Sequence, residues 1–213
     1  MGGILIYSGG MDSTVLLHQF KDSIKLAVSF NYGSKHNEKE ISCAIENCKQ
    51  LGIKHIIINL DFINNYFKSN LLKSGEDIPS GDYQYEDMKK TVVPFRNGIM
   101  LSIAVGIAES NNLDSVLIAN HSGDHAIYPD CRNDFIQAFN LAAISGTYNN
   151  IQILSPYCNK TKSEIAAIGK SLGVDFSKTY SCYNGGTEHC GTCATCIERK
   201  EALKGFDNTK YKI

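Results

Sequence analysis

The hexapeptide SGGMDS, residues 8–13, has the composition of a loop that binds phosphate. Glycine lets the backbone approach an anion closely, so that the next N–H groups can point at it. The apolar run GILIY precedes the hexapeptide and a helical pattern follows, which would place the positive end of a helix dipole at the loop. Ser8 and Ser13 add hydroxyl donors. The alternative is a glycine turn with a serine cap and no ligand.

Asp12 is an anion within this motif, and it would repel a phosphate. Two interpretations are open: Asp12 is the N-cap of the following helix, or its carboxylate holds Mg²⁺ against the phosphates. The motif lacks the Lys-Ser or Lys-Thr ending of a Walker A loop and also differs from the GxGxxG dinucleotide fingerprint.

Four cysteines, in the pattern C-x₇-C-x₂-C-x₂-C, crowd together near the end of the chain. They are Cys182, Cys190, Cys193 and Cys196. Four thiolates can close a tetrahedron around zinc, which is typical of a structural site without an open position. A [4Fe–4S] cluster is the alternative metal centre, since it also takes four thiolates. Disulfides are less expected in a chain without a signal peptide, and His189 is a competing ligand that the four cysteines make unnecessary.

Several cations fall at the ends of predicted strands or the starts of predicted helices, where an open α/β sheet binds its ligands. They are Arg96, Lys162 and the pair Lys35 and His36. Singly, each is more often a solvated surface charge. Together they can neutralise phosphates or a transition state, and we assign Arg96 and Lys162 to that purpose.

The segment YPDCR, residues 128–132, combines a ring, a carboxylate, a thiol and a guanidinium. Tyr128 can stack on a planar base, Asp130 can accept from its N–H groups, and Arg132 can pair with a substrate carboxylate or phosphate. Asp124 is a further candidate for the edge of the base. We interpret Cys131 as a packing or binding residue.

Apolar runs that alternate with amphipathic stretches must position these residues. The runs 3–7, 26–30, 55–60 and 115–120 are typical of buried parallel strands. Helical patterns cover residues 13–20, 37–51, 97–109, 134–144 and 162–172. The repetition predicts an α/β fold with a doubly wound, Rossmann-like parallel sheet.

Two stretches interrupt the alternation. Residues 73–91 are rich in Gly, Pro, Ser, Asp and Tyr, which suits either a mobile loop over an active site or a surface insertion. After Leu172 the pattern gives way to Tyr, Gly, Cys and Thr. We therefore expect residues 1–213 to form a single domain, with 173–213 as a zinc-stapled C-terminal extension.

Bulk composition narrows the function. Hydrophobic residues make up 43% and charged residues 20% of the 213, as in ordinary globular proteins. The 21 basic and 22 acidic residues give a net charge of −1 and are spread along the chain, so a surface for nucleic acid or anionic membrane is not expected. The N-terminus has no signal-peptide pattern, and no apolar run approaches the ~20 residues of a membrane span. We expect a cytoplasmic protein that acts on a small molecule.

The loop resembles the signature SGGxDS of the pyrophosphate-loop ATPases, which cleave ATP between its α and β phosphates. Further segments are similar, in order, to motifs of the 7-cyano-7-deazaguanine synthase family: NYGSKHNEKE (31–40), VPFRN (93–97), GDHAIYPDCR (123–132), TKSEI (161–165) and YSCY with CGTCATC. The family often has YGQRH where this chain has YGSKH, VPGRN where it has VPFRN, and an aliphatic run where it has NHSGDH. The last departure concerns the shape of the base pocket and leaves the reaction class unchanged.

The resemblance implies an ATP-dependent ligase that converts 7-carboxy-7-deazaguanine and ammonia to the nitrile through an adenylated acid and an adenylated amide, in queuosine biosynthesis. It implies ATP, Mg²⁺ and Zn²⁺ as cofactors and a homodimer. We assign catalysis to Asp12, Arg96 and Lys162 and substrate binding to Asp124, Tyr128, Asp130 and Arg132. The residues assigned to ATP are the loop and its flanks: Tyr7, Ser8, Gly9, Gly10, Met11, Asp12, Ser13, Thr14, Val15, Leu16 and Leu17.

Two other functions fit parts of the sequence. A tRNA-thiolating enzyme would share the loop but would need a catalytic cysteine pair or an iron–sulfur cluster, and usually a basic surface. A non-enzymatic zinc-binding module would explain the cysteines and leave SGGMDS without a purpose. Binding and turnover of ATP distinguish it from an enzyme.

Overall fold

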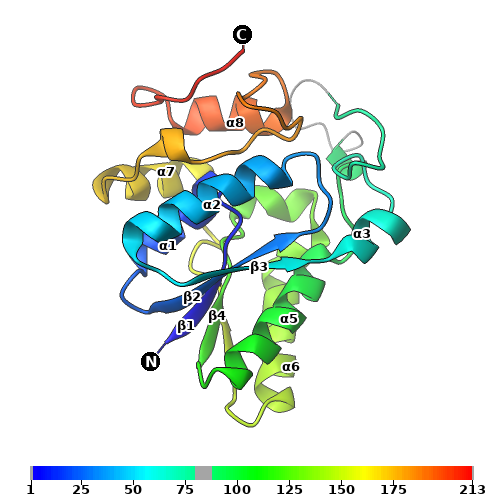
Figure 1. Ribbon diagram of the computed structural model, residues 1–213, viewed down its shortest axis with the longest axis vertical. Helices are drawn as coiled ribbons and strands as arrows, with labels where there is room; N and C mark the ends of the chain where they lie inside the picture. The colour runs from blue at the N-terminus through cyan, green and yellow to red at the C-terminus, as the bar shows by residue number, and fades with distance from the viewer. Residues whose placement is uncertain (1, 80–87, 213) are drawn as a thin grey trace.

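The computed structural model describes residues 2–79 and 88–212 and is built around a five-stranded sheet (Figure 1). The strand order is β3-β2-β1-β4-β5, and every neighbouring pair is parallel. The strands are β1 (Gly3–Ile6), β2 (Ile24–Asn31), β3 (His55–Asn59), β4 (Ser115–Leu117) and β5 (Gln152–Leu154). The predicted fold class is confirmed.

Helices cover both faces of this sheet (Figure 1). One layer contains α1 (Met11–Gln19), α2 (Asn37–Leu51) and α7 (Lys162–Ser171), and the other contains α5 (Arg96–Ser110) and α6 (Asn133–Gly146). The short helix α3 (Asp61–Tyr66) follows β3. Short 3₁₀ helices of the described residues are η1 (Ser122–Ala126), η2 (Pro129–Cys131) and η3 (Phe176–Lys178). Helix α8 (Ala194–Ala202) packs beside α7 at the end of the molecule where the C-terminus lies.

Successive side chains of β1 enter different cores. Ile4 packs with Leu101 and Ala104 of α5, whereas Leu5 packs with Leu16 of α1 and Ile165 of α7. Successive residues of a strand point to opposite faces of a sheet, so a strand covered on both sides must be apolar at every position. This is why the strands are continuous apolar runs in the sequence.

The strand order reverses at β1. The chain runs outward through β2 and β3 and then returns to β4 and β5 on the other side of β1. The two connections leave β1 and β4 on opposite faces, and their divergence opens a crevice at the carboxyl ends of these strands.

The predicted helices are present with shifts of at most two residues at an end, and 37–51 matches α2 in full. The first strands are also placed as predicted. Among the described strands and α-helices, β5 and α3, which are short, and α8, where cysteines and charged residues obscure the apolar side, were not predicted. Helix α8 lies in the stretch after Leu172, where the sequence shows no helical pattern. Within the predicted loop 73–91, residues 80–87 lie outside the described part of the chain.

In the ranges 2–79 and 88–212, no helix is both long and apolar enough to cross a bilayer.

Candidate functional site

A cavity of about 220 Å³ opens at the carboxyl ends of β1, β2 and β4, at the reversal of the sheet. Its wall contains Ile6 and Tyr7 from the end of β1, Ser29 and Phe30 from β2, and Asn120 after β4. The other polar residues that line it are Ser8, Asp12, Ser13, Tyr32, His36, Asn37, Glu40, Arg96, Asn97, His121, Asp124, Tyr128, Lys162, Tyr180, Ser181, Tyr183 and Thr195.

The motif SGGMDS forms the turn from β1 into α1, as its placement in the sequence predicts. Ser8 Oγ accepts the Gly10 N–H at 3.0 Å and shares a hydrogen bond of 3.0 Å with Ser13 Oγ. The hydroxyl of Thr14 donates to the Gly10 carbonyl at 2.8 Å. These bonds fix the loop in a shape that presents the start of α1 to the cavity, which is the arrangement that binds anions.

Gly9 is required by the packing of this loop. Its φ is +90°, and a Cβ atom there would lie 2.1 Å from the carbonyl oxygen of Glu40 on α2. The Gly9 carbonyl also accepts a hydrogen bond of 3.1 Å from the Tyr180 N–H. The glycine therefore lets α2 and the C-terminal segment both approach the phosphate loop.

Asp12 lies in the first turn of α1, and the N-cap position is held by Gly10. The N-cap interpretation of Asp12 is therefore wrong. Its Oδ2 lies 3.4 Å from Lys162 Nζ, and its Oδ1 is buried without a hydrogen-bond partner among the described residues. A buried carboxylate oxygen without a donor suits a cation ligand.

Lys162 is held at the cavity by two carboxylates. Its Nζ donates to Glu198 Oε2 at 2.8 Å and faces Asp12, and the side chain is only 11% exposed. Burial by itself would lower the pKa of Lys162, but Asp12, Glu198 and Asp124 together raise it above its ordinary value. The ammonium is therefore a permanent positive charge in the cavity.

Arg96 begins α5 and lines the same cavity. Its guanidinium donates to Tyr32 Oη at 3.2 Å and lies 5.7 Å from the centre of that ring. Burial opposes its charge, but the neighbouring Tyr32 and Asp130 favour it, so the pKa of Arg96 is raised. The structure thus brings Arg96, Lys162 and Asp12 into one cavity, as their shared assignment requires.

The substrate-binding candidates divide between two places. Tyr128 and Asp124 line the cavity, where the Tyr128 hydroxyl shares hydrogen bonds of 3.2 Å with Thr91 and Tyr183. Asp130 is buried, and its carboxylate accepts the backbone N–H of Asn97 instead of facing the cavity. Arg132 is exposed, and its Nε donates to the His125 carbonyl at 2.9 Å.

The residues assigned to ATP fall into two groups, one in the cavity wall and one in the hydrophobic core. Tyr7, Ser8, Gly10, Met11, Asp12 and Ser13 line the cavity. Val15, Leu16 and Leu17 are fully buried in the core between α1, α2 and α7 and do not line the cavity, because they lie about one helical turn farther from the loop than Met11, Asp12 and Ser13. Of the residues 7–17 that we assign to ATP, only members of the range 7–13 therefore line the cavity.

The pair Lys35 and His36 does not supply two cations to the cavity. Lys35 donates to the carbonyls of Gly75 and Glu76. His36 lines the cavity, but burial lowers the pKa of His36 to about 3, so the ring is neutral near pH 7. Its ring stacks on Tyr183 with centroids 5.4 Å apart.

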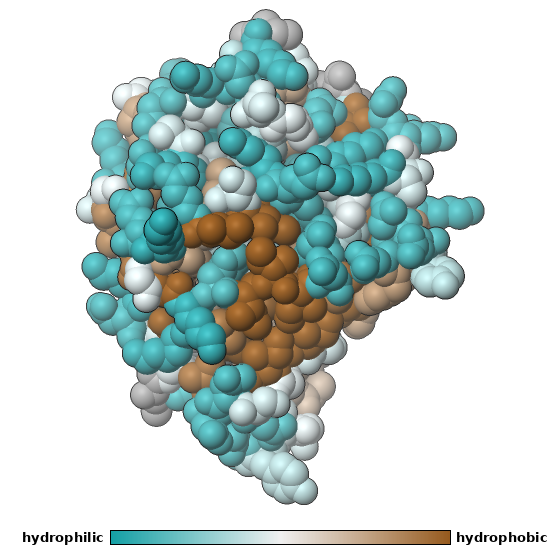
Figure 2. Space-filling model, in the orientation of Figure 1, coloured by the Kyte–Doolittle hydropathy of each residue, from teal (hydrophilic) through white to brown (hydrophobic). Residues whose placement is uncertain are grey.

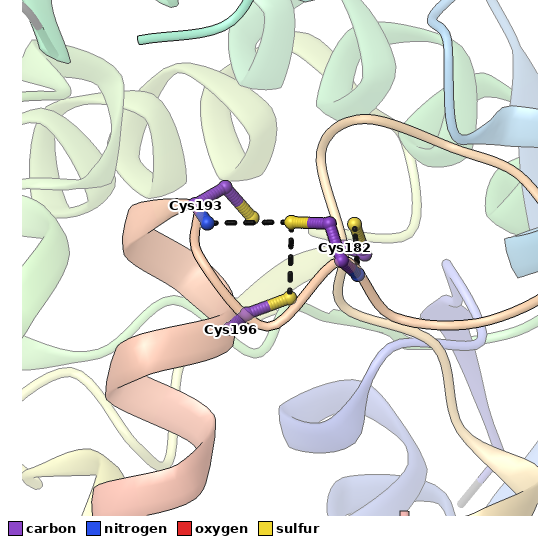
Figure 3. Close-up of side chains that lie close together, drawn as sticks. Cys182, Cys193 and Cys196 are labelled. Atoms are coloured by element: carbon purple, nitrogen blue, oxygen red, sulfur yellow. Dashed lines mark hydrogen bonds between the residues drawn. The ribbon is translucent and has the colours of Figure 1, made fainter. Parts of the chain in front are cut away.

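The four cysteines converge as predicted. Their sulfur atoms all lie within 4.8 Å of one another, and Figure 3 shows Cys182, Cys193 and Cys196 pointing toward one point. Sulfurs around a zinc ion at ~2.3 Å would stand about 3.8 Å apart, and Cys190 and Cys196 Sγ are 3.9 Å apart. Backbone N–H groups of Cys190 and Cys193 donate to the sulfurs of Cys182 and Cys190 at 3.3 Å. The donors and their spacing fit one tetrahedral metal ion.

The cysteine segment also forms a wall of the cavity. Tyr180, Ser181, Tyr183 and Thr195 line it, and all four lie within two residues of a cysteine of the cluster. Behind them, Arg199 is fully buried and donates to Ser181 Oγ at 2.9 Å and to the Phe176 carbonyl at 2.6 Å. A metal in the cluster would therefore support the shape of the cavity.

Several residues of the site were not predicted. They are Glu40, His121, Glu198 and Arg199. His121 Nε2 lies 3.7 Å from Asp124 Oδ1 and 4.0 Å from Asp12 Oδ2. TKSEI contained Lys162 but gave no indication of its partner Glu198, 36 residues away. Such pairings arise from tertiary structure, although Glu40 and His121 lay inside the quoted segments NYGSKHNEKE and NHSGDH.

Comparisons with known proteins identify relatives of this chain. The family model described as "Queuosine biosynthesis protein QueC" matches residues 2–207. The chain is 57% identical over 212 residues to 7-cyano-7-deazaguanine synthase of a strain of Porphyromonas gingivalis, covering 98% of this chain and 96% of the relative. It is 53% identical over 215 residues to the protein of that name from Desulfotalea psychrophila, covering 99% and 98%. The solved NMN synthetase from Francisella tularensis is similar in fold, with a TM-score of 0.52 and 16% identity over 89% of this chain and 70% of that one.

Proposed function

Because the chain belongs to the QueC family of queuosine biosynthesis proteins, we propose that the cavity described above carries out the 7-cyano-7-deazaguanine synthase reaction. The enzyme is an ATP-dependent ligase that acts on a small deazapurine. The observation that carries the site assignment is the meeting, in one cavity, of the phosphate loop, the cations Arg96 and Lys162, and the wall formed by Tyr128 and Asp124.

The chemistry needs two activations, because a carboxylate and an amide are both poor electrophiles. A carboxylate oxygen of 7-carboxy-7-deazaguanine attacks the α-phosphate of ATP and pyrophosphate leaves. Ammonia then displaces AMP to give the amide. The amide oxygen attacks a second ATP, and loss of two N–H protons with cleavage of the C–O bond gives the nitrile and a second AMP. Both rounds need the same in-line attack, so one cavity serves both.

The loop and the two cations of the cavity bind the phosphates and stabilise the negative charge that develops during the reaction. The backbone of residues 8–13 holds the pyrophosphate end of ATP. Lys162 and Arg96 stabilise the charge that accumulates as the bond between the α and β phosphates breaks. Burial strengthens this effect, because Lys162 is 11% exposed and its ammonium is already fixed by two carboxylates.

Mg²⁺ fits the unpartnered oxygen of Asp12. Asp12, with Asp124 nearby in the cavity wall, supplies the carboxylate oxygens that this ion prefers. When bound, Mg²⁺ offsets the negative charge of the phosphates. Asp12 then contributes as a ligand, while its contact with Lys162 orients the ammonium.

We assign the deazaguanine base to the wall around Tyr128 and Asp124. The Tyr128 ring offers a face for stacking, and Asp124 offers a carboxylate for the N–H groups of the base. Asp130 does not contact the base in this assignment. It positions the start of α5 by accepting a hydrogen bond from the backbone N–H of Asn97. A role for Arg132 in substrate binding stays a prediction, because its side chain lies outside the cavity.

Zinc is the metal that we assign to the cysteine cluster. The sulfur spacing supports a single ion, since a four-iron cluster is larger and would hold the thiolates farther apart. Zinc there stabilises the fold of the segment and is not a participant in the reaction. None of the eight cysteines, all of which lie in the described ranges, forms a disulfide, which supports a reducing compartment such as the cytoplasm.

A homodimer is the assembly that we propose, with the apolar face at β3 and α5 as its interface. Figure 2 shows apolar surface gathered where these elements lie in Figure 1. β3 is an edge strand whose partly buried Ile56 and Ile58 lie on the side of the sheet that α5 covers, and the partly buried Ile99, Ile103 and Ile107 follow one side of α5. An apolar sheet edge favours pairing with another chain. Light scattering should give a dimer mass, and Ile103→Lys should give a monomer while Leu141→Lys on α6 should not.

The reaction is tested by mass-resolved product analysis. The protein is incubated with ATP, ammonia and 7-carboxy-7-deazaguanine, with reactions that lack one component as controls. Nitrile and two AMP for each nitrile are expected. Formation of ADP in place of AMP, or of no nitrile, contradicts the proposal. Trapped amide that converts to nitrile on further addition of ATP supports the two-round order.

A further inference from the structure

Glu40 is an acidic residue of α2 that lies against the phosphate loop. A Cβ atom placed on Gly10 would stand 3.3 Å from Glu40 Oε1 and 3.0 Å from Ser8 Oγ. The side chain is 14% exposed and lines the cavity. The mechanism above gives it no purpose, yet its carboxyl group borders the loop that we assign to pyrophosphate.

The groups around Glu40 do not neutralise a carboxylate by direct contact. Immediately before α2, the ring of His36 lies 3.6 Å from Oε2, and burial keeps this ring neutral. Among the described residues, no lysine or arginine nitrogen lies within 4.0 Å of the Glu40 oxygens. Arg96 of α5 acts from farther away, Asp12 of α1 adds negative charge to the same cavity, and Tyr180 brings a neutral hydroxyl.

This environment favours the neutral acid. Burial raises the pKa of Glu40 to about 8, although Arg96 acts in the opposite direction. A phosphate group in the loop would disfavour the carboxylate further, since two anions would then share a largely buried space. A protonated carboxyl group, by contrast, has one O–H to donate, and phosphate oxygens accept such bonds.

We propose that Glu40 is held as a neutral carboxylic acid and donates its O–H to the pyrophosphate end of ATP in the loop. The inference rests on the proposed function for the identity of the ligand. It makes Glu40 a binding residue that recognises phosphate without a positive charge, beside the backbone N–H groups of the loop.

Proton uptake follows from this arrangement. Above pH 8 the free protein carries a Glu40 carboxylate, so that binding of ATP draws one proton from solvent. Departure of pyrophosphate allows the proton to return. Affinity for ATP should therefore fall as the pH rises above 8, because the proton becomes harder to obtain.

Calorimetry with the α,β-methylene analogue of ATP tests the inference on the full, zinc-loaded chain. At pH 8.5, titration in two buffers of different ionisation enthalpy should show uptake of a substantial fraction of one proton for each analogue bound. Glu40→Gln keeps an N–H donor of similar shape. It should bind about two- to fivefold more weakly at pH 7, with no proton uptake from this position and a flatter pH dependence. Glu40→Ala should weaken binding about tenfold or more at pH 7, because the donor is lost.

Glu38→Gln is the matched control, since Glu38 lies on the same helix with its side chain 85% exposed. Urea unfolding of each variant separates lost binding from lost folding. Unchanged buffer dependence in Glu40→Gln, or full analogue binding with abolished nitrile formation in that variant, would overturn the inference in favour of a carboxylate base. Nitrile formation by the wild type without proton uptake defeats this inference alone. Proton uptake without nitrile formation defeats the proposed function alone.

Discussion

The backbone N–H of Asn97 donates a hydrogen bond of 2.8 Å to Oδ2 of Asp130. The Asn97 side chain returns the contact by donating to the Asp130 carbonyl at 3.3 Å and to Cys131 Sγ at 3.1 Å. The segments VPFRN and YPDCR are thus one unit in space although 33 residues separate the two partners. Through this unit, the start of α5 and its Arg96 are fixed against the substrate wall.

Asp130→Ala should destabilise the protein by about 1.5–3 kcal/mol, because it removes a buried, charged acceptor from a backbone N–H. Asp130→Asn keeps an acceptor and should cost less. Both should raise KM for ATP through displacement of Arg96. Urea unfolding and steady-state kinetics measure the two effects, with Asp22→Ala at an exposed position as the control. A larger loss of stability in Asp130→Asn than in Asp130→Ala would contradict this explanation.

Lys162→Ala should lower kcat/KM by about 100-fold or more, since a buried charge that stabilises the leaving pyrophosphate is lost. Asp12 and Glu198 would also face each other without their shared cation. Lys162→Arg should recover part of the rate. Lys170→Ala, at an exposed position of the same helix, is the control. Wild-type kinetics for Lys162→Ala would remove Lys162 from the mechanism.

Removal of metal should loosen the cysteine segment and the cavity wall together. Metal analysis should find one zinc for each chain, and Cys196→Ser should lose it. Hydrogen exchange should then accelerate around Tyr180 to Thr195 while β1 and β2 stay protected. Zinc added back to a chelated sample should restore slow exchange. Slow exchange throughout the segment in metal-free protein would show that the cluster is dispensable for this wall.

Two largely buried groups at the start of α2, its N-cap His36 and Glu40, should give opposite pH dependences of stability. The pKa of Glu40 is raised from 4.5 to about 8, so its contribution is full below pH 4.5 and is lost as the pH rises through 8. The pKa of His36 is lowered from 6.5 to about 3, so its contribution is full above pH 6.5 and is lost as the pH falls toward 3. The two slopes, at most about 1.4 kcal/mol per pH unit each, oppose one another between pH 4.5 and 6.5.

Above pH 6.5 only the Glu40 contribution of this pair changes. The free energy of unfolding of the wild type should fall, relative to Glu40→Gln, by up to about 2 kcal/mol between pH 6.5 and 8. Urea unfolding at half-unit intervals measures the difference between the two proteins. Parallel curves over this range would show that Glu40 is ionised in the folded protein.

Phe95 and Gly98 should be energetically coupled. Phe95 has a φ of +52°, and a Cβ atom on Gly98 would lie 2.4 Å from the Phe95 ring. Gly98→Ala should therefore cost about 1–3 kcal/mol by overpacking. In a Phe95→Gly background the same change should be neutral or stabilising, because alanine favours helix by about 1 kcal/mol. Additive free energies of unfolding across the four proteins would contradict the contact.

The Phe95 position also shows what a sequence motif can indicate. The related family often has glycine where this chain has phenylalanine, and the left-handed backbone at residue 95 is one that glycine adopts without strain. The glycine of VPGRN therefore reflects a left-handed backbone conformation at this position, and this chain adopts that conformation with phenylalanine. The Phe95 ring instead packs edge-on against Phe135, with centroids 5.6 Å apart.

Patterns with short sequence separation were predictable from the residues. The apolar runs of β1 to β3 and the glycine loop before α1 are local, and the cysteine spacing needs only nearby turns. The partner of Lys162 on α8 was not, because it depends on how α7 and α8 meet at the end of the sheet. The approach of Glu40 to the phosphate loop was not predictable either, because it depends on how α2 packs against this loop. β5 was missed since three residues carry too little pattern, and α8 because Cys196 and Arg199 are buried although neither is a typical core residue.

The cavity wall between Tyr180 and Thr195 follows all five strands along the chain. On the ribosome, the sheet and the phosphate loop therefore emerge before the residues that complete the cavity, and domains begin to fold as they emerge. Substrate binding would then be the last property that the nascent protein gains, and with the zinc ion that we propose it would wait for the cysteines to bind this ion. Under this proposal, a cell with little zinc would accumulate chains that have a formed sheet and an incomplete active site.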